Sequence, residues 1–194
     1  MVRPITKIVT ASGRLAPALA RLIGDQRGVS AVEFAMLAPV MIALYFGCVG
    51  ISDGINIDRK VSLTAAALAN LTAQSTTISK GDMTNILNAS SAILAPYSAS
   101  KLKMTVSCLH IDADKNVTVK WSETRNGSKL TSFSFNSSNS ALKVANSQLI
   151  FANVTYDYEP VVGNAIVGDL ELSDQMFMSP RISPPTYDGN KPCT

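Results

Sequence analysis

The stretch "VSAVEFAMLAPVMIALYFGCVGI", residues 29–51, is the longest apolar run in the chain, and Glu33 is its only charged residue. At about 1.5 Å per residue, a helix of this length crosses a hydrocarbon core about 30 Å thick. We therefore predict a single transmembrane helix over residues 29–51. Gly47 and Gly50 permit close packing against a neighbouring helix, although glycine is also common in membrane helices.

The charges on the two sides of this run predict its orientation. Residues 1–28 contain five basic residues and one acidic residue, whereas the run is followed by Ser52, Asp53 and Gly54. The positive-inside rule predicts a cytoplasmic leader and a periplasmic or extracellular C-terminal domain. The run is longer than the usual 7–15-residue core of a cleaved secretory signal, and no Ala-x-Ala site follows it. An uncleaved signal anchor remains an alternative.

Composition bounds the rest of the molecule. The chain has 194 residues, 46% apolar and 16% charged, as expected for one folded domain with accessory segments. Its net charge of +3 comes from the leader, because residues 29–194 contain 12 basic and 13 acidic residues. Nucleic-acid binding needs clustered Lys and Arg on the folded part of a protein. We therefore expect no nucleic-acid partner.

The residues around Glu33 follow a distinctive order. Arg27 and Gly28 precede the apolar run, Glu33 is fifth when Val29 is counted as first, and Phe34 follows. This order resembles the type IV prepilin processing signature, in which a prepilin peptidase cuts after the glycine. The resemblance implies cleavage between Gly28 and Val29, with Glu33 and Phe34 serving assembly.

Cleavage would give Glu33 a partner. A carboxylate in a membrane helix costs up to a few kcal/mol unless it is paired or reaches the interface. Cutting before Val29 creates an α-ammonium with an ordinary pKa of about 7.7–8.0. The Glu33 carboxylate of one subunit can then pair with the ammonium of another and set their axial stagger. Alternatively, Glu33 lies near the cytoplasmic interface and only reaches headgroups.

The longer stretch "QRGVSAVEFAMLAPVMIALYFG" resembles the start of TadE-like proteins, the pseudopilins or minor pilins of the tight-adherence (Tad) pilus system. Gly28, residues 31–34 and Pro39 carry the match, and residues 59–74 and 154–163 resemble later parts of such proteins. The resemblance implies a non-enzymatic subunit in the inner membrane, used in adhesion or secretion. Its partners would be prepilin peptidase and other pilin or pseudopilin subunits. The alternative is an uncleaved single-pass assembly protein that presents a periplasmic binding domain.

The exported part begins with helical patterns. The positions Ile57, Val61, Ala65, Leu68 and Leu71 form one apolar stripe from residue 56 onward, after a predicted bend near Gly54. A second helix is expected to begin at Lys80. Ser79 and Asp82 have the spacing of a capping box, and Pro96 ends the pattern.

The pattern then changes to the two-residue period of strands. Residues 101–111 and 117–121 predict a β-hairpin, residues 148–159 a third strand and residues 170–178 a fourth. One face is expected to hold Leu102, Met104, Val106, Cys108 and His110; in the second strand Val117, Val119 and Trp121 share a face. Residues 126–141 predict a polar surface excursion, and the Pro-rich tail from residue 179 is expected to be extended.

These patterns together predict an α+β fold, in which an N-terminal transmembrane helix precedes a domain with helices on an antiparallel sheet. The expected segments are a leader (1–28), a membrane helix (29–51), a helical region (52–96) and a β-rich region (97–194).

Three cysteines bear on the compartment. Cys48 lies in the apolar run and is expected to be a small buried side chain. Cys108 and Cys193 are disulfide candidates outside the cytoplasm, with two free thiols as the alternative.

No catalytic, cofactor or metal site is predicted. The positions Asp112, Asp114, Asn116, Thr118 and Glu123 have the spacing of EF-hand ligands. However, Val117 stands where that loop needs glycine and the flanks are strands, so a hairpin turn explains the same residues. His110 is the only histidine, which excludes a His-pair metal site, and we expect it at a strand edge or in the core.

Overall fold

The computed structural model describes residues 27–160 and 168–194. The chain divides between Tyr45 and Phe46 into two compact units. The elements are α2 (Arg27–Gln74), β1 (Thr77–Ile78), α3 (Lys80–Ala92), β2 (Leu102–Ile111), β3 (Val117–Arg125), β4 (Ser147–Tyr158), β5 (Leu170–Met178) and β6 (Thr186–Tyr187). Helix α2 is unbroken at Gly54, where we predicted a bend, and at Pro39.

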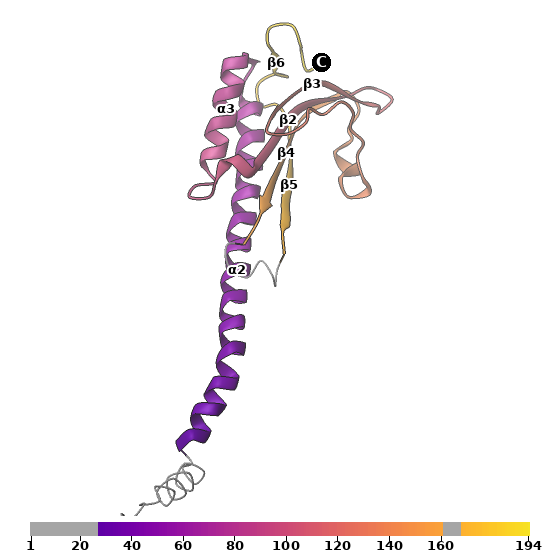
Figure 1. Ribbon diagram of the computed structural model, residues 1–194. Coiled ribbons are helices and arrows are strands. Elements are labelled where there is room, and N and C mark those ends of the chain that lie inside the picture. The colour runs from indigo at the N-terminus through magenta and orange to yellow at the C-terminus, as the bar shows by residue number, and fades with distance from the viewer. Residues whose placement is uncertain (1–26, 161–167) are drawn as a thin grey trace, which may run out of the picture. The chain divides into compact units, whose positions relative to one another are not determined.

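The second unit contains a four-stranded sheet of order β3-β2-β4-β5, in which every neighbouring pair is antiparallel. Residues 46–74 of α2 and the whole of α3 lie beside this sheet (Figure 1). A separate parallel pair joins β1 to β6, which we did not predict. The predicted α+β fold, with helices on an antiparallel sheet, is therefore confirmed.

One face of the sheet packs on the helices and forms the main core. The predicted stripe on α2 is buried at its first four positions, from Ile57 to Leu68, but Leu71 is only half-buried. Thr72 is fully buried near this end, and its hydroxyl donates to the Leu68 carbonyl at 2.8 Å. A threonine can occupy such a position because its hydroxyl is satisfied within its own helix.

The second helix starts as predicted. Ser79 is its N-cap, and the Ser79 hydroxyl and Asp82 carboxylate exchange hydrogen bonds with each other's backbone amides. The Ser79 hydroxyl also donates to the Asp82 carboxylate at 2.7 Å, and this bond, together with the one from the Ser79 amide, lowers the pKa of the Asp82 carboxyl. The capping box is confirmed, and α3 ends at Ala92, four residues before Pro96.

The other face of the sheet has a second, smaller core. Leu109, Ile111, Leu149 and Phe151 are buried there. They are covered by Leu130, Phe133 and Phe135, which come from the segment predicted to be a polar surface excursion. The prediction is wrong for these three residues. Thr131, Ser132 and Ser134, which lie between them, are exposed, so the apolar side chains of this loop pack on the sheet while the polar ones face solvent.

A β-bulge changes the face of one strand. Cys108 pairs with Trp121, but the next residue, Leu109, pairs with Val119, so Lys120 is the extra residue in β3. Val119 therefore packs in the smaller core, whereas Trp121 packs in the main core. The prediction that Val117, Val119 and Trp121 share one face is wrong, because an inserted residue inverts the alternation beyond it.

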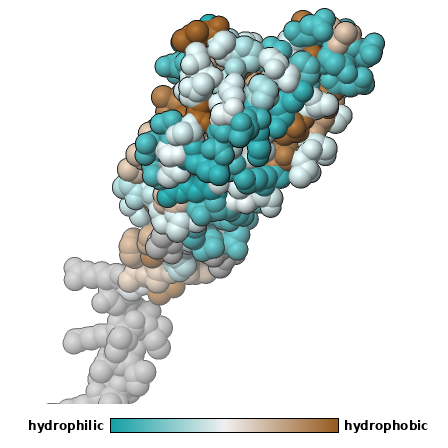
Figure 2. All heavy atoms as spheres, turned by 90° about the horizontal axis from the view of Figure 1, so that it is seen from above, coloured by the Kyte–Doolittle hydropathy of each residue, from teal (hydrophilic) through white to brown (hydrophobic). Residues whose placement is uncertain are grey.

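The C-terminal tail is docked on the domain rather than merely extended. The Thr186 amide donates to the Thr76 carbonyl at 3.0 Å, and the Asp188 amide donates to the Ile78 carbonyl at 2.8 Å. The Tyr187 side chain is only 3% exposed. Seen from the β6 end, the surface is mostly hydrophilic with separate hydrophobic patches (Figure 2).

Candidate assembly segment and its anchor in the domain

The predicted processing and assembly residues all lie on α2. Gly28 and Val29 are in the first described turn of the helix, and Glu33 lies one turn later. All are exposed, with Val29 at 55% and Phe34 at 68%. Residues four apart share one face of a helix, so the Glu33 side chain lies on the same side of α2 as Val29.

The apolar run lacks cover from the protein in the described residues. The large side chains from Val29 to Ile51 include Val32, Met36, Leu37, Val40, Met41, Ile42 and Leu44, and all of these are more than half exposed. A helix of this length and hydropathy can cross a membrane. An apolar surface this long is stable only when lipid or other apolar helices cover it.

The end of the run is anchored to the sheet by a tyrosine. The Tyr158 hydroxyl, at the end of β4, donates to the Gly50 carbonyl at 3.0 Å. A Cβ added at Gly54 would lie 3.5 Å from the Tyr158 ring, in ordinary contact. Burial raises the pKa of the Tyr158 phenol. Sequence reasoning missed this contact, although the Gly50-x-x-x-Gly54 spacing is the signal of a surface open to close approach.

A lysine joins the two helices. The Lys60 ammonium, on α2, donates to the Ile93 carbonyl at 3.2 Å and to the Ala95 carbonyl at 2.7 Å. These carbonyls lie just beyond the C-terminal end of α3, where a helix leaves acceptors unpaired and favours positive charge. Lys60 therefore caps α3 from a neighbouring element, which no local sequence pattern reveals.

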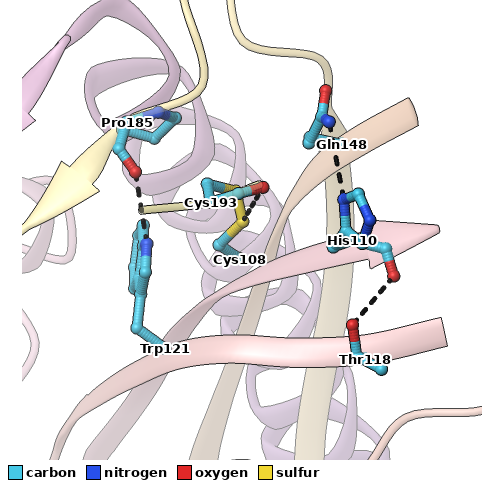
Figure 3. Close-up of a disulfide and its surroundings, with 7 residues drawn as sticks. All are labelled: Cys108, His110, Thr118, Trp121, Gln148, Pro185 and Cys193. Atoms are coloured by element: carbon cyan, nitrogen blue, oxygen red, sulfur yellow. Dashed lines mark hydrogen bonds between the residues drawn. A yellow bond between two sulfur atoms is a disulfide. The ribbon is translucent and has the colours of Figure 1, made fainter. Parts of the chain in front are cut away.

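The structure joins Cys108 to Cys193 as a disulfide, with Cα atoms 5.8 Å apart (Figure 3). Both residues are fully buried. The same region holds the tail in a second way, because the Trp121 indole N–H donates to the Pro185 carbonyl at 3.3 Å. Cys48 is free and exposed on α2, so the prediction of a buried side chain is wrong.

Tyr187, beside the disulfide, has a raised pKa. The Tyr187 ring packs on Trp121, with centroids 5.6 Å apart. Burial, together with the hydrogen bond to the Glu123 carboxylate, raises the pKa of Tyr187 to about 12. The phenol is therefore held neutral inside the contact between the tail and β3.

The other residues considered as metal ligands lie in the β2–β3 turn or in the sheet. Asn116 donates to the Asp112 carboxylate through its backbone amide at 2.7 Å and its side-chain amide at 3.0 Å, which closes the β2–β3 turn. Within residues 27–160 and 168–194, no group of three or more His, Cys, Asp and Glu is placed to hold a metal. His110 is half-buried, and its Nδ1 lies 3.5 Å from the Gln148 amide (Figure 3).

The match to known proteins falls on α2. Residues 28–69 match the family described as TadE-like protein. This segment is TadE-like. The resemblance predicted from the residues around Glu33 is thereby confirmed for residues 28–69. No curated protein and no solved structure matches the chain. The TadE-like segment includes Gly28 and Glu33 as well as Gly50, Gly54 and Lys60, which attach the helix to the domain.

Proposed function

We propose that the chain is a minor pilin or pseudopilin of a Tad-type pilus, used in adhesion or secretion. Prepilin peptidase cuts between Gly28 and Val29, and residues 29–51 then assemble in the inner membrane or against other subunits. The supporting observation is the exposed apolar surface of α2, which begins directly after Gly28 within the TadE-like segment. A helix left bare by its own domain requires another apolar environment.

In this proposal, Glu33 sets the axial offset between neighbouring helices. The new ammonium at Val29 and the Glu33 carboxylate lie on the same side of one helix, a turn apart. A parallel neighbour shifted along the axis by about 6 Å, the rise of four residues, would bring its Val29 ammonium level with this Glu33 carboxylate. Burial would penalise both charges unless they meet, so only one axial offset satisfies them.

The proposed topology places the leader in the cytoplasm and the domain in the periplasm, with a single pass through the inner membrane. The basic residues of the leader support this orientation. The buried Cys108–Cys193 pair is consistent with it, because disulfides persist in oxidising compartments such as the periplasm.

Identification of the mature N-terminus by mass spectrometry tests the processing step. We expect a species that begins at Val29, and we expect Gly28→Leu to keep its leader. The substitution suits the test because a Cβ at Gly28 meets nothing within 4 Å, so the helix itself is undisturbed. If every membrane-resident molecule keeps the leader, the chain is instead an uncleaved assembly protein with a periplasmic binding domain.

The register role is tested separately by Glu33→Gln, which keeps the shape and removes the charge. We expect normal cleavage and a loss of co-purification with other pilus subunits. Met36→Ala is the matched control, because Met36 is 74% exposed on the same segment and carries no charge. Unchanged assembly of Glu33→Gln would refute the ion pair.

A further inference from the structure

One end of the domain lies level with the end of the apolar run. The hydrogen bond from Tyr158 to Gly50 fixes the end of β4 at this position on α2. A groove of about 260 Å³ opens beside it, lined mainly by Ile51, Ile55, Leu170 and Leu172. Ile51, Ile55 and Leu170 are 57%, 51% and 43% exposed. We call the residues around this groove and the two cavities described next the basal surface.

The basal surface is acidic as well as apolar. Six carboxylates line the groove and the two adjoining cavities: Asp53, Asp58, Asp157, Glu159, Asp169 and Glu171. Lys101 pairs with Glu159 at 2.7 Å, and Lys103 pairs with Asp157 at 2.8 Å. Among the residues that the structure describes, the other four carboxylates make no ion pair, although Asp169 and Glu171 also attract Lys101 and Lys103 at longer range.

Tyrosines complete this surface. One adjoining cavity, of about 220 Å³, is lined by Tyr97, Tyr156 and Tyr158 together with Asp53 and Glu159. Tyrosine is enriched where membrane proteins meet the boundary between hydrocarbon and water, because its ring is apolar and its hydroxyl is polar. The opposite, β6 end of the domain is mostly hydrophilic with separate hydrophobic patches (Figure 2).

We propose that the basal surface rests on the lipid bilayer and favours ammonium-bearing zwitterionic headgroups over anionic ones. The apolar groove continues directly from the end of the apolar run, so the lipid that surrounds residues 29–51 meets it next. The four carboxylates outside ion pairs attract an ammonium and repel an anionic headgroup. The inference rests on the proposed membrane insertion of residues 29–51.

Site-specific quenching tests the contact. The full chain carries Cys48→Ser, so that its remaining native cysteines are the two in the disulfide. An environment-sensitive fluorophore is attached at Ile55→Cys or at Leu170→Cys. The labelled protein is reconstituted in phosphatidylethanolamine–phosphatidylcholine vesicles that contain headgroup-region nitroxide lipids. Leu63→Cys is the matched control, because Leu63 is 59% exposed on the same helix, two turns further from the apolar run. Met41→Cys reports on insertion and is read in matching vesicles whose nitroxides lie deep in the acyl chains, because Met41 is ten residues from Ile51 and therefore about 15 Å from the headgroups.

We expect the labels at Ile55 and Leu170 to be quenched at least about threefold more than the label at Leu63, since short-range quenching falls steeply over the roughly 12 Å that eight helical residues span. Equal quenching at Ile55, Leu170 and Leu63, with Met41 strongly quenched, overturns the basal contact and leaves membrane insertion standing. Absence of quenching at Met41 refutes the membrane insertion itself. A third result also overturns the inference. If the labels at Ile55 and Leu170 are not quenched by lipid but become less accessible to water as the protein-to-lipid ratio rises, then a second copy of the chain covers this surface.

A second experiment tests the preference for zwitterionic over anionic headgroups. Replacing a third of the zwitterionic lipid with phosphatidylglycerol is expected to halve the quenching at Leu170. A variant with Asp53→Asn, Asp58→Asn, Asp169→Asn and Glu171→Gln is expected to lose this sensitivity. Equal quenching of the original protein in both vesicle types contradicts the proposed selection. The reduction should also weaken in high salt, because exposed charges are screened within about a Debye length.

Discussion

Breaking the Cys108–Cys193 disulfide should destabilise the domain without releasing its tail. The two cysteines are 85 residues apart, so the chain-entropy relation gives a loss of about 4.6 kcal/mol as an upper estimate. Such a loss would be a large fraction of the roughly 5–15 kcal/mol that stabilises an ordinary domain. The native tail has other attachments, namely the β1–β6 pairing and the contacts of Pro185 and Tyr187 with Trp121.

The chain contains one tryptophan, and it lies at this contact. Trp121 is 3% exposed, so its fluorescence reports directly whether the tail is docked. We propose urea titrations of Cys108→Ala/Cys193→Ala against the unaltered pair, both with Cys48→Ala and in the same detergent. We expect matching blue-shifted emission without urea, and an unfolding free energy lower by about 2–5 kcal/mol in the disulfide-free protein. Addition of reductant to the unaltered pair should give the same loss.

Two results would refute this reasoning. An unchanged urea midpoint after reductant would show that Cys108 and Cys193 are not bonded in the purified protein. A red-shifted Trp121 emission without urea would show that the disulfide alone holds the tail, so that the hydrogen bond to Pro185 and the packing of Tyr187 contribute nothing. The Cys48→Ala variant by itself is the control, and its stability should be unchanged because Cys48 is free and exposed.

Three further measurements follow from single contacts. The raised pKa of Tyr187 means that its stabilising effect is complete below about pH 10 and is lost as pH rises through about 12; Tyr187→Phe should flatten that alkaline decline by up to about 1.4 kcal/mol per pH unit in urea titrations. Lys60→Met should cost about 1–3 kcal/mol and speed hydrogen exchange at the end of α3, because two carbonyls lose a charged donor; equal exchange in both proteins would contradict the cap. Gly54→Ala should stabilise by about 0.5–1 kcal/mol in thermal melts, since its methyl meets Tyr158 at an ordinary 3.5 Å, whereas destabilisation would mean that Tyr158 lies closer.

The features predicted correctly are those encoded by neighbouring residues. The Ser79–Asp82 capping box needs only a four-residue spacing, and the buried stripe from Ile57 to Leu68 needs only helical periodicity. The resemblance around Glu33 is equally local. Each of these signals survives folding because no distant contact competes with it.

The errors have non-local causes. Lys120 looks like an ordinary outward-facing strand residue, but the pairing of β3 with β2 makes it a bulge and puts Trp121 on the other face. Phe133 and Phe135 look like isolated aromatics in a polar segment, yet the second face of the sheet is apolar and needs cover. The Tyr158 hydroxyl meets the Gly50 carbonyl across 108 residues of sequence. In each case the deciding partner is far away in the chain.

The dependence of burial on distant parts of the chain also explains why one helix has both an exposed and a buried apolar segment. Residues 29–51 and 57–73 are both rich in apolar side chains, so composition alone treats them alike. Ile42 is 55% exposed whereas Val61 is fully buried, and the difference arises because the sheet supplies partners only to the later segment. Gly50 is the first buried position along α2, and Tyr158 seals it. The end of β4 therefore determines where α2 passes from the core of the domain to an external apolar environment. This is why contact with the membrane is expected at that end of the domain.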